Sequence, residues 1–193
     1  MSKLNFASDI DGCVLDLDTS LRKEFFDKYG ITVNEKDVRV YNYEDFLDLP
    51  YEDVWVTITE VVERANLDIF ENAQEIINET TNWHGANIPL FITSRKPERL
   101  DATTDNLRKY FTDFYPLHLN GNSKADIINQ FEVNLFVEDC ADTVLDIAVN
   151  TDCTVLLFDH PWNEEFDDKS FKQVERVDNW LEIKEYIDAN FDD

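Results

Sequence analysis

Glycine is scarce in this chain, with four residues among 193, at positions 12, 30, 85 and 121. A P-loop or a G-x-G-x-x-G turn needs several glycines close together, so neither phosphate-binding loop can be built here. The sequence also lacks H-E-x-x-H, G-x-S-x-G and any cluster of cysteine with histidine. Zinc peptidases, serine hydrolases and zinc-binding modules are therefore excluded.

Basic residues are few as well. Only 17 lysines and arginines stand against 42 aspartates and glutamates, which gives a formal charge of −25 and a pI near 4.2. Polymeric nucleic acid is normally bound by lysines and arginines that release counterions from its phosphates, and an anionic membrane also attracts basic segments. The composition therefore argues against both as partners.

Cysteine and long hydrophobic runs are also lacking. The three cysteines, Cys13, Cys140 and Cys153, form no C-x-x-C pair, and the N-terminal residues contain no apolar stretch of signal-peptide length. The longest apolar runs, such as Thr154–Phe158, are far shorter than the roughly 20 residues that a membrane-spanning helix needs. We therefore expect a soluble, cytoplasmic protein with reduced thiols.

The hydrophobic residues that are present suffice for a sizeable core, because they make up 43% of the chain and aromatic residues make up 13%. Short apolar runs alternate with segments of helical spacing. The strand candidates are residues 4–8, 88–93, 115–119, 135–137 and 154–158, and a last helix covers Trp180–Ile187. This alternation predicts an α/β fold, a Rossmann-like parallel sheet with helices on both faces.

Helical spacing dominates from about residue 19 to residue 80. Leu21 and Phe25 share one helical face, Gly30 is a candidate C-terminal cap, and a second helical pattern starts near Val54. Because this segment falls between the first and second strands, it predicts a small inserted helical cap of residues 17–81. The α/β core would then consist of residues 1–16 and 82–193.

Polar side chains collect where the predicted strands end. They are Asp9 and Asp11 after the first strand, Thr93, Ser94 and Arg95 after the second, Lys124 after the third, and Glu138, Asp139 and Asp142 after the fourth. In a doubly wound sheet ligands bind beyond the carboxyl ends of the strands, and residues i and i+2 of an extended segment point the same way. Paired carboxylates, a hydroxyl, a lysine and a further carboxylate suit metal-assisted phosphoryl transfer.

These residues carry a family resemblance over nearly the whole chain. Asp9-x-Asp11-Gly12, Thr93, Lys124 and Glu138-Asp139-x-x-Asp142 resemble, in order, the four motifs of the haloacid dehalogenase-like phosphatases. Phe-Ile-Thr-Ser at 91–94, Val-Glu-Asp at 137–139 and Leu-Phe-Asp-His-Pro-Trp-Asn at 157–163 are similar to the 5′(3′)-deoxyribonucleotidase family and its bacterial and phage relatives. Two positions depart from that pattern, Arg95 in place of a proline and Cys140 in place of an arginine.

The resemblance implies a role for each motif residue. Asp9 would be the nucleophile that forms an aspartyl-phosphate, and Asp11 the general acid and base. Mg²⁺ would be held by Asp9, by the backbone carbonyl of Asp11 and by Asp139. Phosphate would be bound by Thr93, Ser94 and Lys124. Glu138 and Asp142 would contact the metal through water or through its direct ligands. For Glu138 the alternative of a side chain that only contacts solvent stays open.

The remaining candidates are side chains with less defined roles. Arg95 is either a further substrate contact or a surface partner of Glu98 or Asp101. Aromatic residues of the cap could form a base-stacking wall, of which one or two would touch the ligand. These are Phe25, Tyr43, Phe46 and Trp55, with Phe26 and Tyr41 as further cap aromatics. We expect structural roles for His84, His118 and His160, no catalytic role for Pro161-Trp162-Asn163, and no nucleophilic role for Cys13 or Cys140.

The sequence thus predicts a magnesium-dependent phosphatase acting on the 5′-phosphate of (deoxy)nucleoside monophosphates, a small-molecule partner. Alternatives stay open. A phosphatase of the same fold could act on another small phosphomonoester, or the domain could bind a nucleotide without catalysis. A haloacid dehalogenase is disfavoured because Asp11 suits an alkoxide leaving group. A polynucleotide end phosphatase is disfavoured by the acidic surface.

Overall fold

The computed structural model describes residues 3–80 and 88–191. In these residues a six-stranded sheet has the order β3-β2-β1-β4-β5-β6, and every neighbouring pair is parallel. The strands are β1 (Phe6–Ser8), β2 (Leu90–Thr93), β3 (Tyr115–His118), β4 (Leu135–Glu138), β5 (Thr154–Phe158) and β6 (Val174–Val177). The expected α/β fold with a parallel sheet is confirmed.

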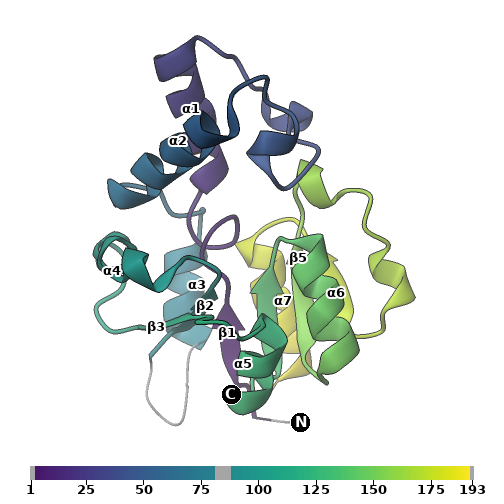
Figure 1. Ribbon diagram of the computed structural model, residues 1–193. Coiled ribbons are helices and arrows are strands. Elements are labelled where there is room, and N and C mark those ends of the chain that lie inside the picture. Colours follow the sequence, from purple (N-terminus) through teal and green to yellow (C-terminus); the bar gives the residue numbers. More distant parts are fainter. Residues whose placement is uncertain (1–2, 81–87, 192–193) are drawn as a thin grey trace.

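Helices cover both faces of the sheet (Figure 1). One face carries α5 (Lys124–Gln130) and α6 (Ala141–Asn150), whose apolar residues pack with Ala7 and Phe136. The other carries α3 (Ala73–Thr80) and α7 (Trp180–Asn190), which pack with Phe6 and Phe91. Between β2 and β3 the chain forms the 3-10 helix η3 (Pro97–Arg99) and α4 (Leu100–Leu107). Because strands β1, β2 and β4 are buried completely, they read as continuous apolar runs rather than alternating ones.

Local sequence sets where several helices begin and end. Ser123 and Asp126 form a capping box at the start of α5, and Pro97 occupies the first turn of η3, where its missing N–H costs nothing. Gly30 ends the first helix with a left-handed φ of 68°, as expected. Strand β6 was not expected, because charged Glu175 and Arg176 interrupt its short apolar pattern.

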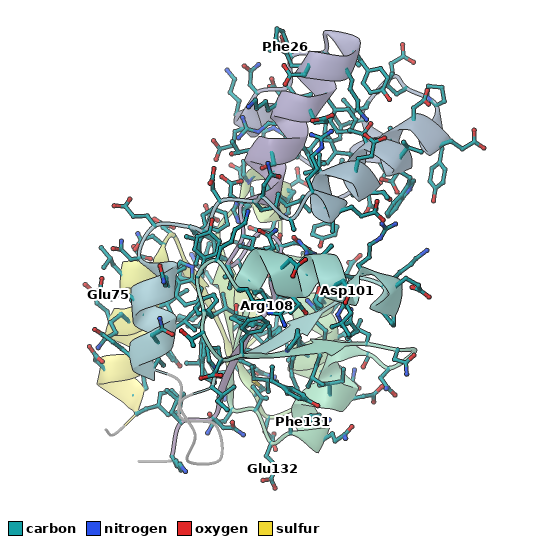
Figure 2. All side chains as sticks on the ribbon, turned by 90° about the vertical axis from the view of Figure 1, so that its left-hand side faces the viewer. Phe26, Glu75, Asp101, Arg108, Phe131 and Glu132 are labelled. Atoms are coloured by element: carbon teal, nitrogen blue, oxygen red, sulfur yellow. The ribbon has the colours of Figure 1, made fainter. Side chains whose placement is uncertain are left out.

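Helices α1 (Leu17–Tyr29) and α2 (Tyr51–Glu63) form a separate layer with the 3-10 helices η1 (Glu35–Asp37) and η2 (Tyr43–Asp45) between them. This layer stands over the carboxyl ends of the strands (Figure 1). In Figure 2, Phe26 lies at its far tip, whereas Phe131 and Glu132 lie at the opposite end of the molecule. Any ligand held at the carboxyl ends of the strands therefore lies between the two parts.

Helix α3 differs from its expected place in the cap. It contacts α7 of the core, and just before it Phe70 donates its backbone N–H to the Val14 carbonyl at 2.9 Å. Figure 2 shows Glu75 of this helix on the side of the core. In the division that we propose, the cap therefore ends before Ile69, which bridges to Leu15. The expected boundary between residues 81 and 82 lies outside the described residues.

Among residues 3–80 and 88–191, two ion pairs connect the cap to the core. Arg39 donates to Glu164 at 2.8 Å, and Arg99 of η3 pairs with Glu63 of α2 and reaches Thr59 at 3.2 Å. Glu164 follows the 3-10 helix η4 (Pro161–Asn163), and the last 3-10 helix, η5 (Asp168–Ser170), precedes β6. Within the described residues no helix combines the length and the apolar character that a membrane crossing requires.

Candidate active site

The four groups of polar residues meet at one edge of the sheet because of strand order. Strand β1, which leads to Asp9 and Asp11, lies between β2, which leads to Thr93, and β4, which leads to Asp139. The Asp9 backbone N–H donates to the Val137 carbonyl at 2.9 Å, so Asp9 still follows the ladder with β4. The parallel arrangement thus brings together residues that are more than 100 positions apart.

Lys124 is buried between two of the carboxylates. Its Nζ lies 2.8 Å from Oδ1 of Asp9 and 2.6 Å from Oε2 of Glu138. Glu138 is also fully buried, and its Oε1 accepts the backbone N–H groups of Asp139 and Cys140 at 3.1 and 3.0 Å. The alternative of a solvated Glu138 is therefore wrong, and Lys124 is not a surface lysine. Glu138 holds the turn from β4 into α6 and orients Lys124 toward Asp9.

The charges of this buried cluster do not balance. Asp9, Glu138 and Asp139 face a single buried ammonium, that of Lys124. Burial, reinforced by Glu138 and Asp11 and opposed by Lys124, raises the pKa of Asp9 to about 7. Burial and the neighbouring Glu138 and Asp9 also raise the pKa of Asp139. Such a cluster favours binding of a cation, because a cation supplies the charge that Lys124 alone does not.

Asp139 could hold such a cation through its carboxylate. Its Oδ1 is buried and has no hydrogen-bond partner among the described residues. One carboxylate oxygen of Asp139, one of Asp9 and the Cys13 sulfur lie within 4.8 Å of one another. Gly12 leaves room for it, since a Cβ atom on Gly12 would lie 2.2 Å from Asp139 Oδ2. Two carboxylates fit a hard divalent cation such as Mg²⁺. The thiol does not, and burial raises the pKa of Cys13 and keeps it protonated.

A second group of contacts supports Asp139 from the turn after β5. Trp162 donates its indole N–H to Asp139 Oδ2 at 3.1 Å, and Asn163 donates to the Asp139 carbonyl at 2.9 Å. His160 stacks on Trp162 with ring centroids 4.1 Å apart, and its Nε2 lies 2.7 Å from the Gly12 carbonyl. Trp162 is therefore a site residue that the sequence analysis missed. The resemblance of residues 157–163 to a family motif was the only indication of it.

Arg95 is buried in the site rather than exposed. Its Nε and Nη2 donate to the two oxygens of Asp11 at 2.7 and 2.6 Å. The alternative of a surface pair with Glu98 or Asp101 is therefore wrong. The Thr93 hydroxyl is buried and accepts the Arg95 backbone N–H at 3.1 Å, so Thr93 lies directly beside this pair.

Three of the remaining polar candidates are placed plainly. Ser94 lines a cavity between the cap and the carboxyl ends of the strands. Asp142 is exposed on the first turn of α6 and is not brought into the cluster. His118 contacts the Arg95 carbonyl through Nδ1 at 2.8 Å, a structural contact as expected. His84 lies outside the described residues.

A cavity of about 280 Å³ opens between the cap and these residues. Its polar end is formed by Asp11, Gly12, Ser94, Arg95 and Asp139. Its other walls are mainly hydrophobic and aromatic side chains of the cap, together with Trp162. They comprise Leu17, Leu21, Val38, Tyr41, Tyr43, Trp55, Ile58 and Val62, with Asp18, Asn42 and Glu44 as polar members. The volume and the apolar walls are typical of a small-molecule site.

The cap aromatics divide into wall and interior. Tyr43 and Trp55 line the cavity, and the Tyr43 hydroxyl is held by the Asp18 carboxylate. Phe25 is fully buried and stacks beneath Tyr43 at 5.3 Å, and Phe46 packs against Tyr43 at 5.1 Å. Phe25 and Phe46 are therefore cap interior. Tyr41 is a further wall residue, and nearby Asp139 together with burial raises the pKa of its hydroxyl.

Comparison with known proteins gives relatives of the same length. No family model matches the chain. It is 26% identical over 189 residues to the putative nucleotidase BH1399 of Halalkalibacterium halodurans, covering 95% of this chain and 92% of that protein. It is 23% identical over 193 residues to the putative nucleotidase YqfW of Bacillus subtilis, covering 97% and 95%.

The solved structures agree on the fold. The crystal structure of a putative phosphatase from Clostridium difficile matches with a TM-score of 0.62 at 17% identity, covering 97% of this chain and all of that one. Hydrolases of the haloacid dehalogenase family are among the other chains with this fold. The chain thus has the fold of the haloacid dehalogenase-like phosphatases and resembles, over nearly its whole length, proteins named as nucleotidases.

Proposed function

We propose that this protein is a phosphatase that hydrolyses the phosphomonoester of (deoxy)nucleoside monophosphates through an aspartyl-phosphate on Asp9, with Mg²⁺ as cofactor. One observation carries the proposal. The buried carboxylates of Asp9 and Asp139 lie within 4.8 Å of each other, and Asp11 and Asp139 open onto an aromatic cavity. A nucleophile, a cation site and a leaving-group pocket are thus contiguous.

The chemistry assigned to the chain runs in two steps. An Asp9 oxygen attacks phosphorus as the bond from phosphorus to the leaving oxygen breaks, and Asp11 gives that oxygen its proton. Water then attacks phosphorus, Asp11 takes back a proton, and phosphate leaves with Asp9 restored. When Mg²⁺ is bound at Asp9, Asp139 and the Asp11 carbonyl, it supplies positive charge that offsets the phosphate and the carboxylates.

Lys124 and the second strand would hold the phosphoryl group. An ammonium has three donors, and in this structure two of them are occupied by Asp9 and Glu138. One donor is thus left for a phosphate oxygen beside the nucleophile. Thr93 and Ser94 lie on the adjacent strand end, where hydroxyl and backbone N–H groups can complete the phosphate site.

The cavity favours a flat leaving group without further negative charge. Tyr43, Trp55 and Trp162 offer aromatic faces, on which a nucleobase stacks with about 1–3 kcal/mol. Four of the described lining residues are acidic and one, Arg95, is basic. A second phosphate or a carboxylate on the substrate would therefore meet repulsion, which favours monophosphates over bisphosphates and over phosphoglycolate.

A substrate panel tests the proposal. Phosphate release is measured from 5′- and 3′-deoxynucleoside monophosphates, ribonucleotides, sugar phosphates, phosphoglycolate and p-nitrophenyl phosphate, each with Mg²⁺ and with EDTA. We expect release from deoxynucleoside monophosphates in Mg²⁺ only. Mass spectrometry of acid-quenched protein should find one added phosphoryl group, and Asp9→Asn, which keeps the shape of the side chain, should lose both signals.

The outcomes separate the alternatives. Preference for a sugar phosphate would replace the nucleotide by another phosphomonoester. Full activity in EDTA would contradict the metal. An Asp9→Asn variant that keeps more than about a hundredth of the wild-type kcat, a loss below roughly 2.7 kcal/mol, would contradict the nucleophile. Binding of a nucleotide without any release would leave a non-catalytic binding domain.

A further inference from the structure

Arg95 holds the second aspartate of the site by both of its oxygens. The guanidinium donates from Nε to Oδ2 of Asp11 at 2.7 Å and from Nη2 to Oδ1 at 2.6 Å, with the Arg95 side chain only 5% exposed. Two parallel bonds between planar groups fix both distance and rotation, unlike a contact to a lysine. The orientation of Asp11 is therefore set by a residue 84 positions later in the chain.

Arg95 is itself held by its surroundings. Its backbone N–H donates to the Thr93 hydroxyl at 3.1 Å, and its Nη1 donates to the Thr103 hydroxyl of α4 at 3.3 Å. His118 of β3 contacts its carbonyl at 2.8 Å. Contacts from β2, β3 and α4 thus fix both the backbone and the side chain. A carboxylate that is anchored on such a support keeps its position when a ligand enters.

The ion pair of Asp11 and Arg95 lies at the wall of the cavity in which the substrate would bind. Asp11 and Arg95 both line the cavity, and Arg95 is the one basic residue among its described lining residues. A carboxylate has about four lone-pair sites, and the two bonds from Arg95 use two of them. One of the two remaining sites can therefore carry the proton that Asp11 gives to the leaving oxygen, while both bonds from Arg95 stay in place.

We infer that Arg95 is a positioning residue, which holds the Asp11 carboxylate against the leaving oxygen of the phosphomonoester. This inference rests on the proposed function, in which Asp11 moves the proton of that oxygen. Among the described residues, the hydrogen bonds of the Arg95 side chain go to Asp11 and Thr103 and not to Asp9. Its effect is thus expected only where the proton carried by Asp11 matters.

Leaving-group dependence tests this role. An alkoxide departs from a deoxynucleoside monophosphate only with a proton, whereas p-nitrophenolate departs without one. We expect Arg95→Met to slow the first step, measured as the rate of leaving-group release in the first turnover, about 100-fold on the deoxynucleoside monophosphate, the cost of misplacing a catalytic group, and less than about threefold on p-nitrophenyl phosphate. The second step, in which Asp11 takes a proton from water, is common to both substrates. Arg95→Lys, which keeps the charge but loses the planar fork, should fall between wild type and Arg95→Met.

Three further variants complete the experiment. Asp11→Asn should show the same split between substrates, and the double variant Asp11→Asn/Arg95→Met should lose no more than Asp11→Asn alone, because the two residues act as a unit. Arg99→Met is the matched control, since Arg99 lies in the same segment but pairs with Glu63 of the cap. Its ratio of kcat values on the two substrates should equal that of wild type.

The outcomes distinguish this inference from the proposed function. Equal losses on both substrates in the rate of first-turnover leaving-group release would show that Arg95 acts on phosphate or on folding, and additive losses in the double variant would show that it acts independently of Asp11. Either result overturns the inference while the phosphatase remains. A wild-type protein that releases phosphate from neither substrate overturns the proposed function, and the inference with it. Thermal unfolding of each variant identifies losses that come from folding.

Discussion

Gly12 and Asp139 lie so close together that a Cβ atom on Gly12 would be 2.2 Å from Oδ2 and 2.7 Å from Cγ of Asp139. Gly12 also has a φ of +76°, a backbone conformation that other residues adopt only with strain. The turn after β1 thus excludes any side chain at the point where the Asp139 carboxylate, a proposed metal ligand, approaches. The glycine of the Asp-x-Asp-Gly motif serves both the turn and the carboxylate.

Gly12→Ala should therefore displace Asp139 and lose divalent cation binding. We expect the affinity for Mg²⁺, measured by calorimetry, to fall at least tenfold. Gly30→Ala is the matched control, because Gly30 has a φ of +68° and no atom of the described residues lies within 4 Å of the added Cβ. Both variants should lose about 1 kcal/mol of unfolding free energy from backbone strain. Equal Mg²⁺ affinity in the two variants would contradict the close contact.

Lys124 should be the most costly lysine to remove. Lys124→Met leaves the buried carboxylates of Asp9 and Glu138 without the cation that pairs with them, so we expect a loss of roughly 3–5 kcal/mol in the free energy of unfolding at pH 8. Adding Glu138→Gln should recover part of this loss, because it removes one buried negative charge. The amide oxygen can still accept from the backbone N–H groups of Asp139 and Cys140. Urea unfolding of both variants provides the measurement.

The control for this comparison is a lysine in a surface pair. Lys184 contacts Asp188 one helical turn away, and both side chains are partly exposed. Lys184→Met should therefore cost less than about 1 kcal/mol. A Lys124→Met variant as stable as Lys184→Met would show that the buried carboxylates take up protons or are otherwise compensated.

Much of the fold and most of the site could be predicted from the sequence. Continuous apolar runs located the central strands, and the alternation with helices fixed a parallel sheet. The sheet in turn brought Asp9, Thr93, Lys124 and Asp139 to one edge. These inferences succeed because strand periodicity and the carboxyl-end rule depend only on local sequence and on element order.

What could not be predicted depends on contacts between distant segments. Arg95 follows a strand and reads equally well as a surface residue, until the fold places it 2.6 Å from Asp11. Trp162 likewise gains its role only when the turn after β5 lies beside Asp139. Helical spacing predicted α3 but not that it packs against α7 of the core. Edge strand β6 was not predicted, because the charged residues Glu175 and Arg176 interrupt its apolar pattern.

The affinity for Mg²⁺ should depend on pH because of Asp9. In the cation-free protein its pKa is raised to about 7, mainly by burial, whereas in the unfolded chain it is near 3.8. The folded protein therefore holds an extra proton between these values, and the resulting stability is complete below about pH 4 and lost as the pH rises through 7. Since Mg²⁺ binds ionised carboxylates, and the pKa of Asp139 is raised as well, the affinity should rise by at least about tenfold per pH unit below pH 7.

Two measurements check this dependence. Calorimetry at pH 6 in buffers of different ionisation enthalpy should detect proton release on Mg²⁺ binding, and release should be smaller at pH 8, where Asp9 is already ionised. Urea unfolding without divalent cations should show stability falling from pH 5 to pH 8, with a weaker fall in Asp9→Asn. Because the chain carries a formal charge of −25, the difference between wild type and Asp9→Asn isolates the Asp9 contribution from general repulsion. An identical pH dependence in both would contradict the raised pKa.

The cap should decide which leaving group is accepted, and Trp55 is its best probe. Trp55 lines the cavity and is 41% exposed, so its ring is open to a ligand. A nucleobase stacked on it would contribute about 1–3 kcal/mol, which corresponds to roughly a five- to 150-fold factor in binding. Trp55→Leu should therefore raise KM for a deoxynucleoside monophosphate by a factor in this range, while kcat on p-nitrophenyl phosphate changes little. Tyr43→Leu, on the same wall, should act in the same direction.

Two other cap aromatics serve as controls for this prediction. Phe26 lies at the far tip of the cap and is 56% exposed (Figure 2), so Phe26→Leu should change neither KM nor stability. Phe25 is fully buried beneath Tyr43, so Phe25→Leu should lower the melting temperature and leave KM for folded enzyme within about twofold of wild type. If Trp55→Leu and Tyr43→Leu behave like Phe26→Leu, and a sugar phosphate without a base competes as well as a deoxynucleotide, then the cap does not read a nucleobase. The substrate is then another small phosphomonoester.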